Sequence, residues 1–389
     1  MKKYCIITLF LCLIALLYGC GDNLTGKSTE TPSPLTYSYV GHRAFTDISP
    51  VDLSSSSIAF CEFAGRLTLA YIDTSRNVIV YTFNGSEWEK LNGGPISTGR
   101  LTCYEFNELS MTVINDELFI GFSEFDATDS NYINYVVKRY SGNQWVDAGG
   151  VVTSIKADIL MIAAKIASND GKLYVAYAHQ TSNISMNESK LKVLIDNSWQ
   201  EVSSNPFSEN HAVSLDFIFD DDIPFVAHSF GFMGIGIKSL VENGWNNELD
   251  TLQLMGYDLS IMKENGALYL SYSKYVPTDA NDRIESYGRI NGNWEELDIV
   301  APTGTIRRTL LFSYNGVPHL AYIHEMDDNA SVSIAVLNGK KFKGIFEQSF
   351  PIKTGCYNHC LFFRDGCLYV GFYDYENNNR VSVIQISMN

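Results

Sequence analysis

The chain has 389 residues, of which 44 are acidic and 28 are basic, so its formal net charge at neutral pH is −16. This charge disfavours nucleic acids and anionic lipid headgroups as direct partners, because a negative surface repels both. A chain of this length ordinarily predicts two or three domains, unless a repeat builds one large domain.

The first predicted segment is an export signal at residues 1–19. Met1-Lys2-Lys3 precedes an apolar run from Tyr4 to Tyr18, which is shorter than the roughly 20 residues that a membrane-spanning helix needs. No later segment of the sequence is long and apolar enough to cross a membrane. We therefore expect the rest of the chain to be exported as a soluble domain.

The end of this segment, Leu17-Tyr18-Gly19-Cys20, resembles the lipobox of bacterial lipoproteins. The resemblance implies that Cys20 is acylated, with palmitate as a possible chain, and becomes the mature amino terminus. The domain would then be held at a membrane of the cell envelope, in the periplasm or at the cell surface. Tyr18 departs from the lipobox pattern, and an ordinary signal peptide is the alternative interpretation. Residues 20–35 are rich in Ser, Thr and Pro and predict a flexible tether.

Residues 36–389 contain a repeat. Its marker is a tryptophan shortly after a tight polar turn, which recurs every 46 to 57 residues at Trp88, Trp145, Trp199, Trp245 and Trp294. A period of this size is typical of stacked units such as propeller blades. Asn-Gly and Asp-Gly pairs between the apolar runs predict tight hairpins inside each unit. A sixth unit has Phe342 in the place of the tryptophan, and a seventh ends after residues 381–386.

The second strand of every unit aligns position by position. One site is always small, at Ala70, Gly121, Ala176, Ala227, Ser271, Ala321 and Gly371. The next site is aromatic or histidine, at Tyr71, Phe122, Tyr177, His228, Tyr272, Tyr322 and Phe372. Apolar or small residues on both faces are expected where other sheets cover each sheet on both sides. We predict an all-β fold, a single closed seven-bladed β-propeller of four-stranded blades.

The seventh unit lacks a fourth strand, and the segment Thr36 to Gly41 supplies the missing pattern. Its residues Tyr37, Val40 and Gly41 match Trp145, Ala148 and Gly149 of the second unit. We therefore expect an N-terminal strand to close the ring, which removes exposed sheet edges. A row of separate β-sandwiches fits poorly, because each unit has about half of the ~100 residues of a sandwich. The Gly-x-x-Trp repeat is similar to that of seven-bladed extracellular propellers, without matching a named subclass.

The predicted binding face follows from the lengths of the connections. Turns between first and second and between third and fourth strands are tight and lie on one face, while the other face carries loops of variable length. Second strands end at this variable face with Asp73, Glu124, His179, Phe230, Lys274, His324 and Asp374, and inner strands add Asp258, Arg308 and Asn358 at one aligned level. From these we predict a ligand site of Asp258, Arg308, Asn358, Lys274, His324 and Asp374. The alternative is that strand ends carry polar residues because they emerge into water.

Neither the cysteines nor the acidic pairs have the spacing of a metal site, and we predict no cofactor and no metal. Beyond Cys20 there is an odd number of cysteines, Cys61, Cys103, Cys356, Cys360 and Cys367, which we interpret mainly as buried strand thiols. A disulfide through Cys61 between the first and seventh blades stays open. The acidic pairs Asp126 and Asp129, Asp279 and Asp282, and Asp327 and Asp328 lack the spacing of a calcium loop. The apolar loop Phe230 to Gly234 suggests either contact with a partner or packing over the channel.

Two functions remain after these observations. The first is a membrane-anchored module that binds a glycan, a peptide or an envelope protein at the variable face. The second is a glycan-active hydrolase or lyase with its site at the channel mouth, around Asp258, Arg308, His324 and Asp374. The absence of a nucleophile motif or a phosphate loop favours the module. The sequence predicts neither the ligand nor the oligomeric state.

Overall fold

The computed structural model describes residues 35–45, 57–73, 75–92, 96–97, 101, 109–156, 161–180, 188–208, 212–229, 234–242, 244–251, 256–274, 283–299, 305–326, 329–350, 359–378 and 380–388. The predicted signal peptide and Cys20 lie outside these residues, so both stay predictions. Contacts group the chain into two units, and the second, Thr36–Asn389, is described here by itself. Among the described residues, no helix has the length and apolar character needed to span a membrane.

Within the described residues of this unit, strands β1 to β28 group into sets of four antiparallel strands, which follow chain order except in the seventh set. The first sheet contains β2 (Ile58–Phe63), β3 (Arg66–Ile72), β4 (Val78–Phe83) and β5 (Trp88–Lys90). The second contains β6 (Ser110–Ile114), β7 (Glu117–Phe125), β8 (Tyr132–Ser141) and β9 (Gln144–Lys156). The third contains β10 (Met161–Asn169), β11 (Lys172–Gln180), β12 (Glu188–Ile195) and β13 (Ser198–Glu201). The fourth contains β14 (Leu215–Asp220), β15 (Ile223–Ser229), β16 (Ile235–Val241) and β17 (Gly244–Thr251).

The next two sheets are joined at their outer edges. The fifth contains β18 (Gly256–Glu264), β19 (Ala267–Lys274), β20 (Arg283–Ile290) and β21 (Asn293–Ile299). The sixth contains β22 (Thr305–Tyr314), β23 (Val317–Met326), β24 (Asn329–Asn338) and β25 (Lys341–Phe350). A short parallel pairing of Asp298 and Ile299 with Lys341 and Phe342 links β21 to β25, so the two together form an eight-stranded sheet. We count them separately because each has its own antiparallel set.

The seventh sheet combines the two ends of the unit. It contains β26 (His359–Arg364), β27 (Cys367–Asp374) and β28 (Arg380–Ser387), and a short 3₁₀ turn (Tyr375–Asn377) follows β27. Its fourth strand is β1 (Tyr37–Tyr39), which pairs antiparallel with β28 through Tyr37 and Ile386. The segment that matched the second unit in sequence thus occupies the predicted place in this sheet.

The tight turns form where the sequence predicted them. The first residue of each turn between first and second strands has a φ between 46° and 53°, at Ala64, Asn115, Asp170, Asp221, Asn265, Asn315 and Asp365. Six of these seven are Asn or Asp, which tolerate this left-handed conformation better than most other residues. Positive φ angles match the right-handed twist of the two strands that the turn joins.

Two of the repeat tryptophans, Trp88 and Trp199, pack one sheet against the preceding outer strand. The indole Nε1 of Trp88 donates to the carbonyl of Val40 at 2.8 Å, and that of Trp199 donates to the equivalent carbonyl of Ala148 at 3.0 Å. The next residue in each outer segment is a glycine with positive φ, Gly41 or Gly149, against which the same indole lies. This shared geometry confirms that the segment around Val40 is the structural equivalent of the fourth strand of the second sheet.

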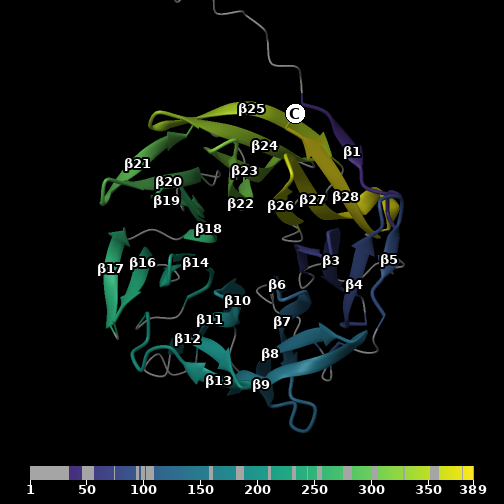
Figure 1. Ribbon diagram of the computed structural model, residues 1–389. Helices are drawn as coiled ribbons and strands as arrows, with labels where there is room; N and C mark the ends of the chain where they lie inside the picture. Colours follow the sequence, from purple (N-terminus) through teal and green to yellow (C-terminus); the bar gives the residue numbers. More distant parts are fainter. Residues whose placement is uncertain are drawn as a thin grey trace, which may run out of the picture. The chain divides into compact units, whose positions relative to one another are not determined.

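The core lies between neighbouring sheets. The predicted small and aromatic positions of the second strands are buried, including the neighbours Ala176 and Tyr177, which lie on opposite faces of β11. First strands of successive sheets contact one another in turn, and β26 contacts β2. Figure 1 shows these first strands nearest the centre of the arrangement of sheets. The prediction of an all-β fold made of four-stranded sheets is confirmed.

Candidate functional site

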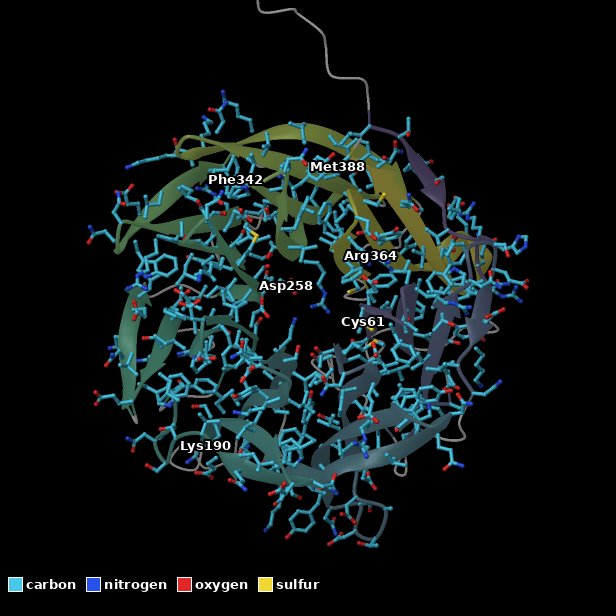
Figure 2. All side chains as sticks on the ribbon, in the orientation of Figure 1. Cys61, Lys190, Asp258, Phe342, Arg364 and Met388 are labelled. Atoms are coloured by element: carbon cyan, nitrogen blue, oxygen red, sulfur yellow. The ribbon has the colours of Figure 1, made fainter. Side chains whose placement is uncertain are left out.

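Two residues of the predicted site occupy the same irregularity on neighbouring inner strands. The pairing of β18 with β19 shifts register between Tyr257 and Ser260, and that of β22 with β23 shifts at Arg308. Asp258 and Arg308 lie in these β-bulges with φ angles of 53° and 52°. A positive φ is unfavourable for arginine, and such conformations gather at functional sites where the surrounding structure enforces them. Figure 2 shows the Asp258 side chain toward the centre.

Asp258 and Arg308 form an ion pair that links three sheets. The Asp258 carboxylate accepts from the backbone N–H of Arg308 at 3.1 Å and from its Nη1 at 3.2 Å. Arg308 Nε in turn donates to the carbonyl of His359 on β26 at 3.1 Å. The Arg308 side chain is 24% exposed and that of Asp258 is 14% exposed. The pair is therefore braced by protein on one side and open to solvent on the other.

The Asp258 link belongs to a series that connects neighbouring inner strands. In each case a side-chain oxygen accepts from a backbone N–H of the next sheet, as in Ser57 with Leu109, Ser110 with Ile166, Ser214 with Leu259, Asp216 with Ile261, and Ser260 with Leu311. A serine performs this role at the position of the fourth sheet that is equivalent to Asp258. The hydrogen bond to the next strand therefore does not require a charged acceptor. The charge of Asp258 has a second role, which is to bind the guanidinium of Arg308.

The other predicted site residues have partners of their own. Lys274 pairs with Glu285, which also accepts from the Tyr272 hydroxyl. His324 is buried, with its Nε2 3.5 Å from Glu347 Oε1, and burial lowers its pKa although Glu347 acts in the opposite direction. The predicted residues therefore do not form one cluster. Asn358 lies outside the described residues, as do Phe230 and most of the apolar loop after it.

Asp374 is fully buried and joins the two ends of the unit. Its carboxylate accepts from Arg43 Nε at 2.5 Å and Nη2 at 3.0 Å, from Asn377 Nδ2 at 2.9 Å and from the Ser382 hydroxyl at 3.2 Å. Hydrogen bonds to Asp374 and Glu376 raise the pKa of Arg43. This carboxylate is enclosed by four donors, an arrangement that stabilises the meeting of β27 with the segment after β1.

The structure adds a buried pair that the alignment did not predict. His359 Nε2 lies 3.6 Å from Glu325 Oε1 between the sixth and seventh sheets, and both side chains are buried. Glu325 directly follows His324 on β23, so successive side chains point to opposite faces of the sheet. The alignment followed the face of His324 only. The signal available in the sequence was the pair of adjacent ionisable residues, His324 and Glu325, near the end of a strand whose two faces are both covered.

Two further groups of predicted residues show local roles. Asp126 accepts hydrogen bonds from Thr128, Asn134 and the backbone of Asp129. These bonds lower the pKa of Asp126, and the bond from the Thr128 hydroxyl has the largest effect. Asp126 therefore organises its own loop. Among the described residues there is no group of three side chains placed to hold a metal ion. Cys61 and Cys367 form no disulfide within the described part of the chain, and burial with the nearby Glu62 raises the pKa of the Cys61 thiol to about 12. Cys103 and Cys356 lie outside the described residues.

Comparison with protein-family models and with curated proteins gives no match. Solved structures do match. The polysaccharide lyase Uly1 is 11% identical with a TM-score of 0.57, covering 85% of this chain and 90% of that chain. The α-L-arabinofuranosidase Arb93A from Fusarium graminearum, in complex with an iminosugar inhibitor, is 10% identical with a TM-score of 0.51, covering 89% and 99%. At these identities the likeness concerns the fold, which is all-β and shared with propeller-type lyases and glycosidases.

Proposed function

We propose that residues 36–389 form a closed seven-bladed β-propeller that binds an acidic glycan at the mouth of its channel. Closure is supported by the pairing of β1 with β28 and by the contact of β26 with β2. In such a ring the inner strands are held by their neighbours on both sides, and no long sheet edge is exposed.

The observation that carries the binding proposal is the pair of Asp258 and Arg308 in aligned left-handed bulges. Holding an arginine in this conformation costs on the order of 1–3 kcal/mol, which the surrounding structure must offset. The guanidinium is 24% exposed beside the Asp258 carboxylate, so an anionic group of a ligand would share it with that carboxylate. A guanidinium binds the carboxylate of a uronic acid or a sulfate ester through paired hydrogen bonds. We therefore expect a glycan that carries such groups.

Binding is favoured over hydrolysis by the state of the carboxylates. A hydrolase needs two carboxyl groups that face each other across the sugar, about 5 to 10 Å apart. Asp258 and Asp374 are instead each committed to an arginine, Arg308 and Arg43. The alternative of a glycan-active hydrolase or lyase draws support from the names of the two structural neighbours, a polysaccharide lyase and an arabinofuranosidase.

The proposal extends to the location of the protein. A lipid on Cys20 would anchor the domain to a membrane of the cell envelope, with residues 21–35 as the tether. Incorporation of a labelled palmitate analogue into the full chain, and its loss in Cys20→Ser, is the expected result. Label that persists in Cys20→Ser would contradict anchoring at this residue, and so would an unlabelled wild-type chain that is cleaved and released.

Glycan binding is tested with the full chain, solubilised in detergent, on an array of uronate-containing, sulfated and neutral glycans. We expect retention on acidic glycans that Arg308→Ala abolishes. Arg76→Ala is the matched control, because Arg76 also has a left-handed backbone, at φ 62°, and lies in a loop on the variable face. Binding that survives Arg308→Ala, or that is confined to neutral glycans, would overturn the proposed site. Shorter or unsaturated products released from the array would favour the enzyme.

A further inference from the structure

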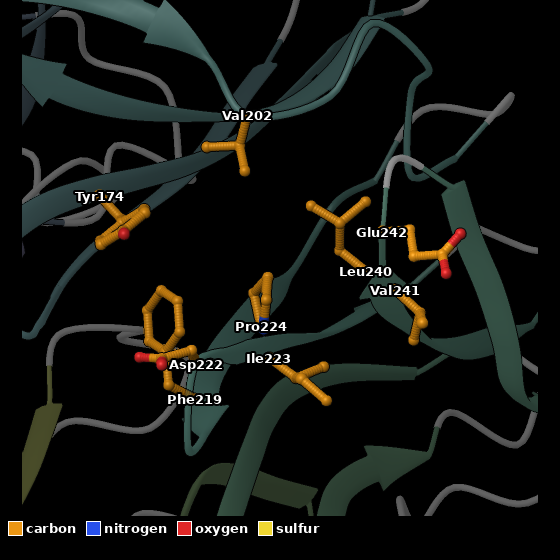
Figure 3. Close-up of a pocket in the computed structure, with 9 residues that line it drawn as sticks. All are labelled: Tyr174, Val202, Phe219, Asp222, Ile223, Pro224, Leu240, Val241 and Glu242. Atoms are coloured by element: carbon orange, nitrogen blue, oxygen red, sulfur yellow. The ribbon is translucent and has the colours of Figure 1, made fainter.

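A pocket lies between the third and fourth sheets, on the side of the tight turns. Its volume is about 340 Å³, within the range of small-ligand sites. Figure 3 shows its lining, in which Asp222 belongs to the turn between β14 and β15 and Glu242 to the turn between β16 and β17. Tyr174 comes from β11 of the preceding sheet. We call this the turn-side pocket, and it is separate from the channel mouth, which lies at the variable face.

The floor and walls of the turn-side pocket are apolar. The rings of Tyr174 and Phe219 lie against each other with centroids 4.7 Å apart and planes tilted by 55°. Ile223 is 39% exposed and Val241 is 42% exposed, although both are branched apolar side chains. Covering apolar surface of this kind removes it from water and stabilises a complex. A ligand with an apolar segment therefore fits this lining.

The polar groups of the lining are negative. Asp222 and Glu242 are both exposed carboxylates, and no basic residue lines the pocket among those that the structure describes. Asn169 Nδ2 donates to Asp222 Oδ1 at 3.2 Å, which holds that carboxylate toward the third sheet. Burial raises the pKa of Tyr174, and the charges of Asp222 and Asp170 raise it further. The pocket thus combines an aromatic ring, aliphatic walls and two carboxylates.

This combination selects a cation on an apolar stem. Carboxylates only accept hydrogen bonds, so they leave an acceptor-only ligand unpaired, and they repel an anionic lipid headgroup while they attract a cation. A guanidinium matches carboxylates in a planar fork and stacks on aromatic rings, while the methylene stem of arginine packs on aliphatic side chains. We propose that the turn-side pocket binds an arginine side chain presented by a partner polypeptide. This inference does not depend on glycan binding at the channel mouth.

The probe is the peptide acetyl-Gly-Arg-Gly-amide, titrated into the full chain in detergent and followed by calorimetry. Its counterpart with citrulline has nearly the same shape without the charge. We expect saturable binding of the arginine peptide, weakened about ten-fold in the double variant Asp222→Asn with Glu242→Gln, because the variant loses both ion pairs to the guanidinium. The citrulline peptide is expected to bind at least about ten-fold more weakly than the arginine peptide.

The matched control removes two charges from equivalent turns of other sheets. Asp116→Asn lies between β6 and β7, and Glu87→Gln lies between β4 and β5; both residues are exposed and neither lines the pocket. This control variant should bind the arginine peptide as the wild type does. Equal weakening in the control would reduce the effect to net charge and overturn the proposal. Equal affinity for the citrulline peptide, or no saturable binding of either peptide, would also overturn it.

Discussion

The carboxylate of Asp258 accepts one hydrogen bond from the backbone N–H of Arg308 and a second from its guanidinium, at 3.1 and 3.2 Å. One side chain therefore holds both the backbone and the charged group of a residue fifty positions later. Because Arg308 has a left-handed backbone, the bond to its N–H fixes the bulge that aims the guanidinium. Asp258 thus has two roles, an ion pair with the guanidinium and a hydrogen bond to the next strand, and substitutions can separate them.

Asp258→Asn and Asp258→Ala are expected to differ in stability. Asparagine tolerates the left-handed conformation and keeps an oxygen that can accept from the Arg308 N–H, so we expect a loss below about 1 kcal/mol. Alanine removes this acceptor and is strained at φ 53°, which together predict a loss of about 2 to 3 kcal/mol. Urea unfolding of the two variants measures the difference. Equal losses would show that the charge, and not the link, stabilises this part of the structure.

The tryptophans provide a second matched comparison. The indole Nε1 of Trp199 donates to Ala148, whereas the buried Nε1 of Trp294 has no hydrogen-bond partner among the described residues. Phenylalanine keeps an aromatic ring at either position and removes only the donor and part of the ring. We expect Trp199→Phe to lower the unfolding free energy by about 1 kcal/mol more than Trp294→Phe. A larger loss for Trp294→Phe would mean that ring packing decides the contribution at both positions.

Gly149→Ala tests the close contact between the second and third sheets. A Cβ at this position would lie 2.5 Å from Leu194 Cδ1 and 2.9 Å from Trp199 Nε1. Crowding adds about 1 to 3 kcal/mol to the strain of a positive φ, which is about 1 to 2 kcal/mol. Gly142 has a similar φ, 58°, with nothing within 4 Å of such a Cβ, so Gly142→Ala carries the strain alone. Thermal unfolding should rank Gly149→Ala as clearly less stable, and similar values would exclude a contribution from crowding.

Sequence repeats predicted the features that every sheet shares. The turn at Asn265-Gly266, the small site at Ala176 and the match of Val40 with Ala148 all recur. Local backbone chemistry produces the turn, and the packing of each sheet against the next produces the other two. Alignment also placed Asp258 and Arg308 at one level, because both lie eight residues before the second residue of a turn. The fold could be predicted to this extent because its units repeat.

The partners of the site residues could not be predicted in this way. Asp374 meets Arg43 across 331 positions, and Lys274 meets Glu285 across a loop, so neither partner occupies a repeated position. Each ion pair depends on the face of the sheet to which a side chain at the strand end points. A shift of one residue along the strand moves the side chain to the other face. The turn-side pocket likewise arises from residues particular to two sheets. Features that are unique to one place leave no periodic signal in the sequence.

His228 is expected to make the unfolding free energy of the unit depend on pH. It occupies the position where six of the seven sheets carry Tyr or Phe, and it is fully buried beside the Phe207 ring. Burial lowers its pKa to about 3, and the charge of Lys238 acts in the same direction. Because the pKa in the folded state lies below the value of about 6.5 expected when unfolded, protons bind the unfolded chain preferentially below that pH. The stability contributed by neutral His228 is complete above pH 6.5 and falls as the pH approaches 3.

His228→Phe should therefore flatten the pH dependence of unfolding. Between about pH 7 and pH 4 the wild type is expected to lose about 3 kcal/mol through this residue, which the variant cannot lose. Burial also lowers the pKa values of His319 and His324, so some dependence of the same sign remains in the variant. Phenylalanine is the sharpest substitution, because Phe122 and Phe372 occupy the equivalent buried position in other sheets. Parallel curves of unfolding free energy against pH for the two proteins would show that His228 does not take up a proton when the chain unfolds.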